Sequence, residues 1–361
     1  MVATQRPTNK SGVGAVREKR SGSFFEPIYD PTDTQPFPED TWPKTPNQRK
    51  DHVTLTSGKF LKTWQRDEKI VISNVIFDKC DFLGDFTSAT PTFKNCEFDR
   101  CDFGLTKWRR AKFKGCKFYR CSLTLATFEG CEFRDCKFSE IGLSGNETLL
   151  IGSTFTNPAE FINAAYVCVD EETLKTRGRG VIRQYQIMRL EGTRATVARA
   201  IMNNMMTYGD EKTYYKSIEL YQNISIKAKI MEVKYKLSEN TGLDESVINI
   251  IDLVTLCFES VIINIAGKLN NWGASIARPT LIGALLIAIF AFLYWVSGIR
   301  ETFLGALSAS IDITLLIGYT KHAANNLTSG TKFVFSLNMI SGLIWYSIFL
   351  PTIINRVSRV R

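Results

Sequence analysis

The chain carries, at residues 93–138, the stretch FKNCEFDRCDFGLTKWRRAKFKGCKFYRCSLTLATFEGCEFRDCKF, in which a large apolar residue returns at every fifth position. These large residues are Phe93, Phe98, Phe103, Trp108, Phe113, Phe118, Leu123, Phe128, Phe133 and Phe138. A small or short residue, often cysteine, stands two positions before most of them. Neither the 3.6-residue period of a helix nor the two-residue period of a strand fits this spacing. A short, fixed repeat of this kind predicts a solenoid.

The repeat extends beyond this stretch and resembles the pentapeptide-repeat family. Phe77 and Phe82 begin the series, one extra residue enters before Phe93, and the pattern continues to Phe155. The resemblance implies a right-handed, four-sided β-helix with about four pentapeptides per coil, with the large and the small residue both pointing inward. We therefore expect residues 51–156 to form a β-helical domain.

Seven of the nine cysteines lie in the repeat, and the coil length predicts how they stack. Residues twenty apart should share a face, so Cys96, Cys116 and Cys136 form one column, and Cys101 and Cys121 another. Stacked coils lie about 4.8 Å apart, like neighbouring strands. We interpret these cysteines as small buried apolar residues of a reducing cytosol. No C-x-x-C pair occurs, so we predict no zinc or other metal site.

Charge on the outward positions is mixed, with a basic run from Lys107 to Arg120. This balance excludes an acidic mimic of DNA. We interpret the basic run as a solvated face, and the alternative is a patch for an anion or a nucleotide. The net charge of +9 and the pI of about 9.0 fit anionic lipid better than nucleic acid, because apolar segments of membrane-spanning length follow.

The regions on either side of the repeat differ in composition. Residues 1–50 are rich in Pro, Thr, Ser and Lys and predict a disordered tail, and no secretory signal is expected there. Residues 157–245 predict a cytoplasmic helical connector, with helices over residues 159–175, 181–206 and 210–237. The last of these resembles the helical connector between pentapeptide repeats and a two-span pore in some bacterial proteins.

Residues 246–266 are apolar but contain Asp252 and Glu259. Placing an acid in the middle of a membrane costs about 2.5–3.5 kcal/mol on insertion scales. Because the two acids are seven residues apart, they share one helix face. We predict an amphipathic helix within residues 246–277, on the cytoplasmic membrane surface or against the helical domain, and the alternative is a third membrane span.

Two long apolar runs without charged side chains follow, Thr280–Gly298 and Phe333–Ile354. Each approaches the ~20 residues that a helix needs to cross a membrane. The first half of the intervening segment, Glu301–Lys332, is also apolar, which predicts that it dips into the membrane inside a protein-lined vestibule. The alternative for the two runs is a buried helical hairpin in a soluble protein.

This order of elements, with FLGALSASIDITLLIGYT between the runs, resembles the two-span pore module of the tetrameric potassium-channel superfamily. The resemblance covers about the last 80 residues and implies a homotetramer with a re-entrant pore helix. It places the filter at Leu316, Ile317, Gly318, Tyr319, Thr320 and Lys321, and a gating hinge at Gly342 and Pro351. The family's T-V-G-Y-G becomes L-I-G-Y-T here, and Lys321 follows. Threonine resists the backbone conformation that glycine allows, so potassium selectivity is not expected.

Basic residues at Lys268, Arg278, Arg356, Arg359 and Arg361 flank the two runs and predict that both termini are cytoplasmic, in the bacterial inner membrane. Few residues follow the second run, so we expect gating to come from the N-terminal domains under an unknown cytoplasmic effector. We find no catalytic constellation and expect neither an enzyme nor a cofactor. The leading hypothesis is a homotetrameric ion channel. The alternatives are a membrane-anchored scaffold with a non-conducting pore module, and a phage-defence effector that depolarises the membrane.

Overall fold

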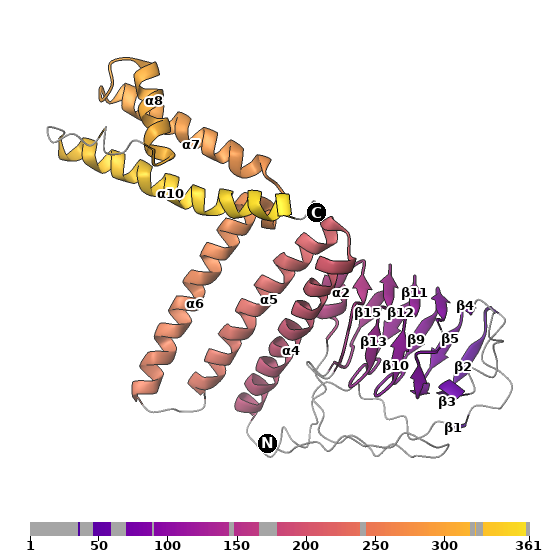
Figure 1. Cartoon of the computed structure of the whole chain (residues 1–361). Helices are drawn as coiled ribbons and strands as arrows, with labels where there is room; N and C mark the ends of the chain where they lie inside the picture. Colours follow the sequence, from indigo (N-terminus) through magenta and orange to yellow (C-terminus); the bar gives the residue numbers. More distant parts are fainter. Residues whose placement is uncertain are drawn as a thin grey trace. The chain divides into compact units, whose positions relative to one another are not determined.

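We describe the protein from a computed structural model of the whole chain. The structure describes residues 35–36, 46–58, 70–88, 90–143, 148–165, 179–238, 243–317, 322 and 328–358. The chain divides into two compact units, residues 1–258 and 259–361, and each is described by itself (Figure 1).

Short parallel strands wind into a β-solenoid with four faces, and each face is a parallel sheet (Figure 1). One face contains β2 (Arg49–Asp51), β5 (Ile76–Asp78), β9 (Glu97–Asp99), β12 (Lys117–Tyr119) and β15 (Lys137–Ser139). The next contains β4 (Val71–Ser73), β8 (Thr92–Lys94), β11 (Lys112–Lys114), β14 (Glu132–Arg134) and β16 (Thr154–Phe155). The third contains β7 (Asp85–Phe86), β10 (Lys107–Arg109) and β13 (Thr127–Glu129). The fourth contains β1 (Gln35–Pro36), β3 (Val53–Thr56) and β6 (Asp81–Leu83).

The strand register confirms the predicted coil length. Phe113 lies opposite Phe93 on one neighbouring strand and opposite Phe133 on the other, so equivalent positions are twenty residues apart. Phe77 pairs with Phe98, one residue more, because of the extra residue that enters the repeat before Phe93. Strand pairing in the solenoid starts before the predicted residue 51, since β1 at Gln35–Pro36 pairs with β3 and β2 begins at Arg49.

Stacked phenyl rings fill the interior of the solenoid. Phe113 stacks on Phe93 with ring centroids 5.0 Å apart and on Phe133 at 4.9 Å, and the rings are nearly parallel. Rings from adjacent faces meet edge-on, as Phe113 does with Phe118 at 5.6 Å. Both geometries suit the quadrupole of an aromatic ring. The five-residue repeat therefore produces a continuous aromatic core, and the prediction that these side chains point inward is confirmed.

The corners of the coil are turned by residues in the left-handed backbone region. They stand two positions after the large residue, as Asn95, Arg100, Arg120 and Asp135 do, each with φ near 50°. Among the described corner residues, Gly84, Gly115, Gly130 and Gly152 lack a Cβ. Side chains in this conformation are unfavourable, so the corners depend on the stacked core for their stability.

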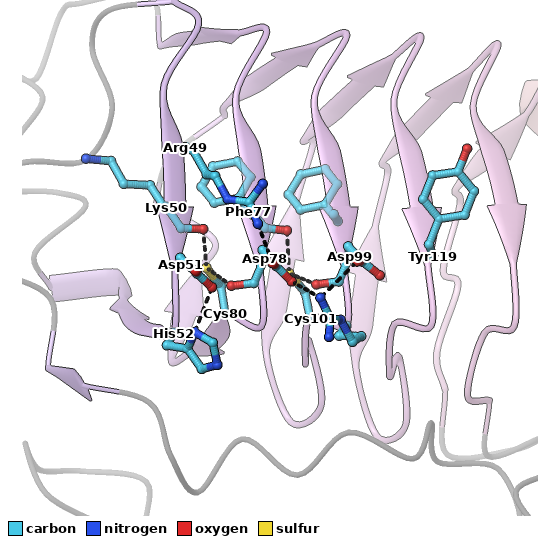
Figure 2. A network of polar contacts seen from close by, with 12 residues as sticks. Arg49, Lys50, Asp51, His52, Phe77, Asp78, Cys80, Asp99, Cys101 and Tyr119 are labelled. Atoms are coloured by element: carbon cyan, nitrogen blue, oxygen red, sulfur yellow. Dashed lines mark hydrogen bonds and ion pairs between the residues drawn. The ribbon is translucent and has the colours of Figure 1, made fainter.

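A polar network on the β2–β5–β9 face joins successive coils (Figure 2). The buried carboxylate of Asp78 accepts from Arg49 at 2.7 Å and from Arg100 at 2.8 Å. Just inside, the thiol of Cys101 donates to the carbonyl of Phe77 at 3.2 Å. The two guanidinium groups compensate the buried negative charge of Asp78, which would otherwise be unfavourable. The contacts connect three neighbouring strands.

Three residues of the basic run from Lys107 to Arg120 pair with acids on an adjacent coil. Arg109 pairs with Glu129 at 3.1 Å, Lys117 with Glu97 at 3.5 Å, and Arg120 with Glu140 at 3.2 Å. Each acid lies twenty residues away, on the adjacent coil. Exposed pairs of this kind stabilise only weakly, which agrees with the interpretation as a solvated face.

The cysteines form the predicted columns. The thiol of Cys116 lies between those of Cys96 and Cys136, and that of Cys101 between those of Cys80 and Cys121. Burial raises the pKa of the Cys101 and Cys116 thiols well above the ordinary value, and raises that of Cys131 to about 12. Because the thiolate is the reactive form, these side chains behave as small apolar residues.

Helices close the end of the solenoid. Phe161 of α2 (Pro158–Asn163) packs on Phe155 at 4.6 Å and covers the last coil. Helix α4 (Arg179–Tyr208) adds Val197 and Ile201 to the same core, and α5 (Glu211–Ser238) packs along α4. Buried Glu191 on α4 binds Lys227 of α5 at 2.9 Å.

The predicted helix over residues 159–175 is wrong in its extent where the structure describes it. Helix α2 ends at Asn163, and Ala165 instead forms a bridge with Ile141 of the solenoid. Covering the last coil requires only one apolar helical turn, after which the chain returns to the sheet. Residues 166–175 lie outside the described residues. The other two helices agree with prediction to within about two residues.

Three helices are long and apolar enough to span a membrane: α6 (Leu243–Asn270), α7 (Ala277–Val296) and α10 (Ser329–Ser358). Between the last two lies α8 (Phe303–Thr314), and the 3-10 turn η3 (Asn271–Gly273) follows α6. The most apolar stretch of α6 has no buried residue within the chain. Length and composition therefore keep a third span open for α6, and the surface helix stays a prediction.

Two positions on α6 distinguish these alternatives. Thr255 is one turn from Glu259 and shares the acidic face, whereas Cys257 points to the opposite side. In a Cys168→Ser background in nanodiscs, we expect an impermeant maleimide to label Thr255→Cys and to leave Cys257 unreacted, because only the acidic face meets water. The seven buried solenoid thiols add no background. Protection of both positions, with reaction of both after denaturation, would show instead that α6 crosses the membrane.

Candidate functional site

Helix α8 is the short element around which the C-terminal unit packs. The hydroxyl of Thr302 caps its first turn by accepting from the amide of Gly305 at 3.1 Å. Its buried positions follow the spacing i, i+3, i+4, i+7, i+8 and are mostly small: Ala306, Ala309, Ser310, Ile313 and Thr314. Small residues allow close approach between helices in membranes. The helix therefore lies against both α7 and α10.

A buried polar network joins the three helices. The amide of Asn338 on α10 donates to the hydroxyl of Tyr294 on α7 at 2.8 Å, and its carbonyl accepts from Thr314 on α8 at 2.8 Å. The hydroxyl of Ser310 donates to the carbonyl of Ile287 at 2.8 Å. All four side chains are fully buried. In a membrane, apolar contacts between helices are about equally favourable in many arrangements. Hydrogen bonds of this kind therefore fix the helices in one of them.

Replacing Asn338 by leucine is expected to destabilise this unit by about 1–2 kcal/mol, because the buried hydroxyls of Tyr294 and Thr314 lose their partner. The measurement is the melting temperature of the detergent-solubilised chain. Ser347→Leu on the exposed side of α10 is the matched control and should leave the melting temperature near that of the wild type. A Tyr294→Phe/Asn338→Leu double-mutant cycle should show coupling, and strictly additive effects would contradict the network.

Two glycines let bulky groups approach the long helices. A Cβ at Gly342 would lie 2.3 Å from the carbonyl oxygen of Thr314, so α10 touches the backbone at the end of α8. At Gly283 of α7 a Cβ would lie 2.4 Å from the indole of Trp345, which donates to the carbonyl of Pro279 at 2.6 Å. These contacts lock α10 to both neighbours.

The end of α8 decides how the predicted filter begins. The amide of Ile317 donates to the carbonyl of Asp312 at 2.9 Å, and that of Leu316 to the carbonyl of Ile313 at 3.1 Å. Leu316 has φ of 60°. This pair of bonds is the Schellman motif, whose left-handed residue is usually glycine. Two carbonyls at the end of the helix are thus already occupied by the chain itself.

The structure places only part of the predicted filter. Leu316 and Ile317 directly follow α8 and are 41% and 73% exposed within the single chain. Gly318, Tyr319, Thr320 and Lys321 lie outside the described residues. The filter and its role therefore stay a prediction.

The hinge residues both lie within α10, which is continuous from Ser329 to Ser358. Gly342 is buried at the contact with α8, whereas Pro351 is exposed. Proline has no N–H for the carbonyl of Ser347, so the helix is locally weaker there. The structure thus gives Gly342 a packing role that sequence reasoning missed, and the hinge itself stays a prediction.

Sequence reasoning also missed Asn338, Tyr294 and Thr314. Asn338 is the one carboxamide between Phe333 and Pro351, and a polar residue in an apolar run is a signal for a buried contact. Its partners cannot be read from the sequence, because they lie 44 and 24 residues away. Within the described ranges, no group of three His, Cys, Asp or Glu side chains could hold a metal ion.

Comparison with known proteins addresses the solenoid. Residues 93–137 match the family model for pentapeptide repeats, described as nine copies. This stretch is a pentapeptide-repeat β-solenoid. The match covers less than half of the chain, so it characterises this region and not the helical part. A search of curated proteins finds no match.

Proposed function

We propose that the chain forms a homotetrameric ion channel in the bacterial inner membrane, with α7 and α10 spanning the bilayer and α8 re-entering it beside the pore. The observation that supports this best is the packing of α8. A twelve-residue apolar helix, too short to cross a bilayer, lies with its small-residue face on two helices of spanning length and is joined to both by buried polar contacts. Irregular chain at membrane depth needs such protein cover.

The residues after α8 do not favour a potassium filter. Leu316 stands where the resembled family has threonine, and Lys321 would place four positive charges at the mouth of a tetramer. A filter for potassium needs free backbone carbonyls aimed at the ion. We therefore propose a pore that is weakly selective or passes anions, and that is closed at rest.

Gating is assigned to the solenoid and the α4–α5 pair, acting on α10 near Gly342 and Pro351. A signal opens such a gate only if it binds the open and closed states with different affinity. The proposed partners are further copies of the chain, lipid, the permeant ions and a cytoplasmic effector. Nucleic acid is not among them.

Planar-bilayer recording of the purified chain tests the proposal through Ile317. We expect Ile317→Cys to carry a current that charged thiol reagents change at once, because this side chain would face the ion path. Leu304→Cys is the matched control: it is 76% exposed, comparable with 73% for Ile317, but lies at the start of α8. Absence of current under every effector tested, or equal sensitivity of both variants, would count against a pore.

One observation favours a second candidate, a membrane-anchored scaffold whose pore module does not conduct. In the Schellman motif, Leu316 and Ile317, the first two predicted filter residues, bond back to α8 and end the helix, with Leu316 in the left-handed region. Replacing residues 316–321 with polar filter residues separates the two. A scaffold should keep its cellular phenotype, whereas a pore should change its current or its effect on membrane potential, read with a potential-sensitive dye.

A further inference from the structure

Three side chains meet near the C-terminal end of α8. Arg300, in the loop before α8, lies with its Nη2 2.7 Å from Nδ1 of His322. The other ring nitrogen of His322, Nε2, lies 3.0 Å from Oδ2 of Asp312 on α8. The imidazole is 14% exposed and the Asp312 carboxylate 33% exposed. His322 therefore links the segment before α8 to the segment after it.

The chemistry of this contact determines the state of the ring. A guanidinium has donors and no acceptor, so Nδ1 of His322 must be unprotonated to accept from Arg300. The proton of the neutral ring is then on Nε2, from which it donates to Asp312. Within the described part of the chain, no carboxylate pairs with Arg300, and its Nε is buried without a partner. The position of Arg300 thus depends on the neutral form of His322.

We infer that Arg300, His322 and Asp312 form a proton-operated latch between the loop before α8 and residue 322 after it. When a proton binds Nδ1, two donors and two positive charges face each other, and the Arg300 contact is lost. The bond to Asp312 is kept and becomes charge-assisted. The loop between α7 and α8 is released, while His322 stays on α8.

The surroundings leave few other groups to alter this response. Helix α7 carries no charged residue between 280 and 296. The charged groups on the described elements around the ring are Arg300 and Glu301 in the loop, Asp312 on α8 and Lys332 at the start of α10. A role for the latch in controlling conduction rests on the proposed pore.

The two histidines of the chain make a direct test by nitrogen NMR of histidine-labelled protein in nanodiscs. At pH 8 we expect His322 to carry its proton on Nε2. His52 is the internal control, because its Nδ1 lies 2.7 Å from Oδ1 of Asp51 and should carry the proton of its neutral ring. His52→Gln assigns the two signals. A proton on Nδ1 of His322 at pH 8 would overturn the latch.

Hydrogen exchange supplies the second readout. On going from pH 8 to pH 5.5, with intrinsic rates corrected, exchange in residues 297–302 should rise about tenfold or more, the factor expected for losing one bond to a charged group. His322→Gln should abolish this rise, since its amide accepts from Arg300 and donates to Asp312 at either pH. A rise that persists in this variant would overturn the proposal. Neither readout needs a current, so a chain that shows both effects but never conducts supports the latch and contradicts only the pore.

Discussion

Replacing Phe113 by alanine is expected to lower the free energy of unfolding of the solenoid by about 3–5 kcal/mol, the largest effect of any single core change considered for this chain. The ring is fully buried and stacks on Phe93 and Phe133 at 5.0 and 4.9 Å. Because neighbouring coils hold their own rings in register, the surroundings cannot collapse into the cavity. The loss therefore combines buried apolar surface with an unfilled space inside a stack.

Native-state hydrogen exchange of the full chain measures this effect coil by coil. Protection should fall most at β8, β11 and β14, which carry the three stacked rings. Lys112→Ala is the matched control, because Lys112 is on the same strand but exposed. Equal loss of protection in the two variants would show that the aromatic stack does not dominate the stability of the solenoid.

The second large effect is expected at Gly342 in the C-terminal unit. In Gly342→Ala, the new Cβ would lie 2.3 Å from the carbonyl oxygen and 2.9 Å from the Cα of Thr314. Both are backbone atoms, so neither can move aside as a flexible side chain would. Overpacking typically costs about 1–3 kcal/mol, and we expect the melting temperature of the detergent-solubilised chain to fall accordingly.

Gly330→Ala is the control for this prediction, since its Cβ would meet nothing within 4 Å in the same helix. Alanine is the better helix former by about 1 kcal/mol, so this variant should be at least as stable as the wild type. The two variants also distinguish a packing role of Gly342 from a role as a hinge. If Gly342 were only a hinge, Gly342→Ala would be stable and would change gating alone.

Much of the solenoid is predictable because its information is local. Phe93, Phe113 and Phe133 recur with one period, and a coil of twenty residues follows once the resemblance to pentapeptide repeats supplies the four sides. The same arithmetic predicts the column of Cys96, Cys116 and Cys136. The C-terminal end of the solenoid is less predictable. The length of α2 depends on how much of the last coil Phe161 must cover.

The candidate site was predictable only in outline. Two apolar runs and the short helix between them follow from composition, and the structure contains α7, α8 and α10 there. The contacts that hold them do not follow, because the partners of Asn338 come from two other helices. The contacts of His322 with Asp312 and Arg300 likewise do not follow, because these partners lie 10 and 22 residues away in the sequence.

By itself, the sequence determined the five-residue repeat and the positions of the apolar helices. Both depend on periodicity or composition, which are properties of neighbouring residues along the chain. The coil length and the inward columns are what the resemblance to pentapeptide repeats implies. The tertiary structure alone decided that Gly342 is a contact with Thr314, that Asn338 joins three helices, and that Leu316 ends α8 in a left-handed turn. These features depend on which surfaces meet when helices pack, and helix packing is set by steric fit and hydrogen-bond partners far apart in the sequence.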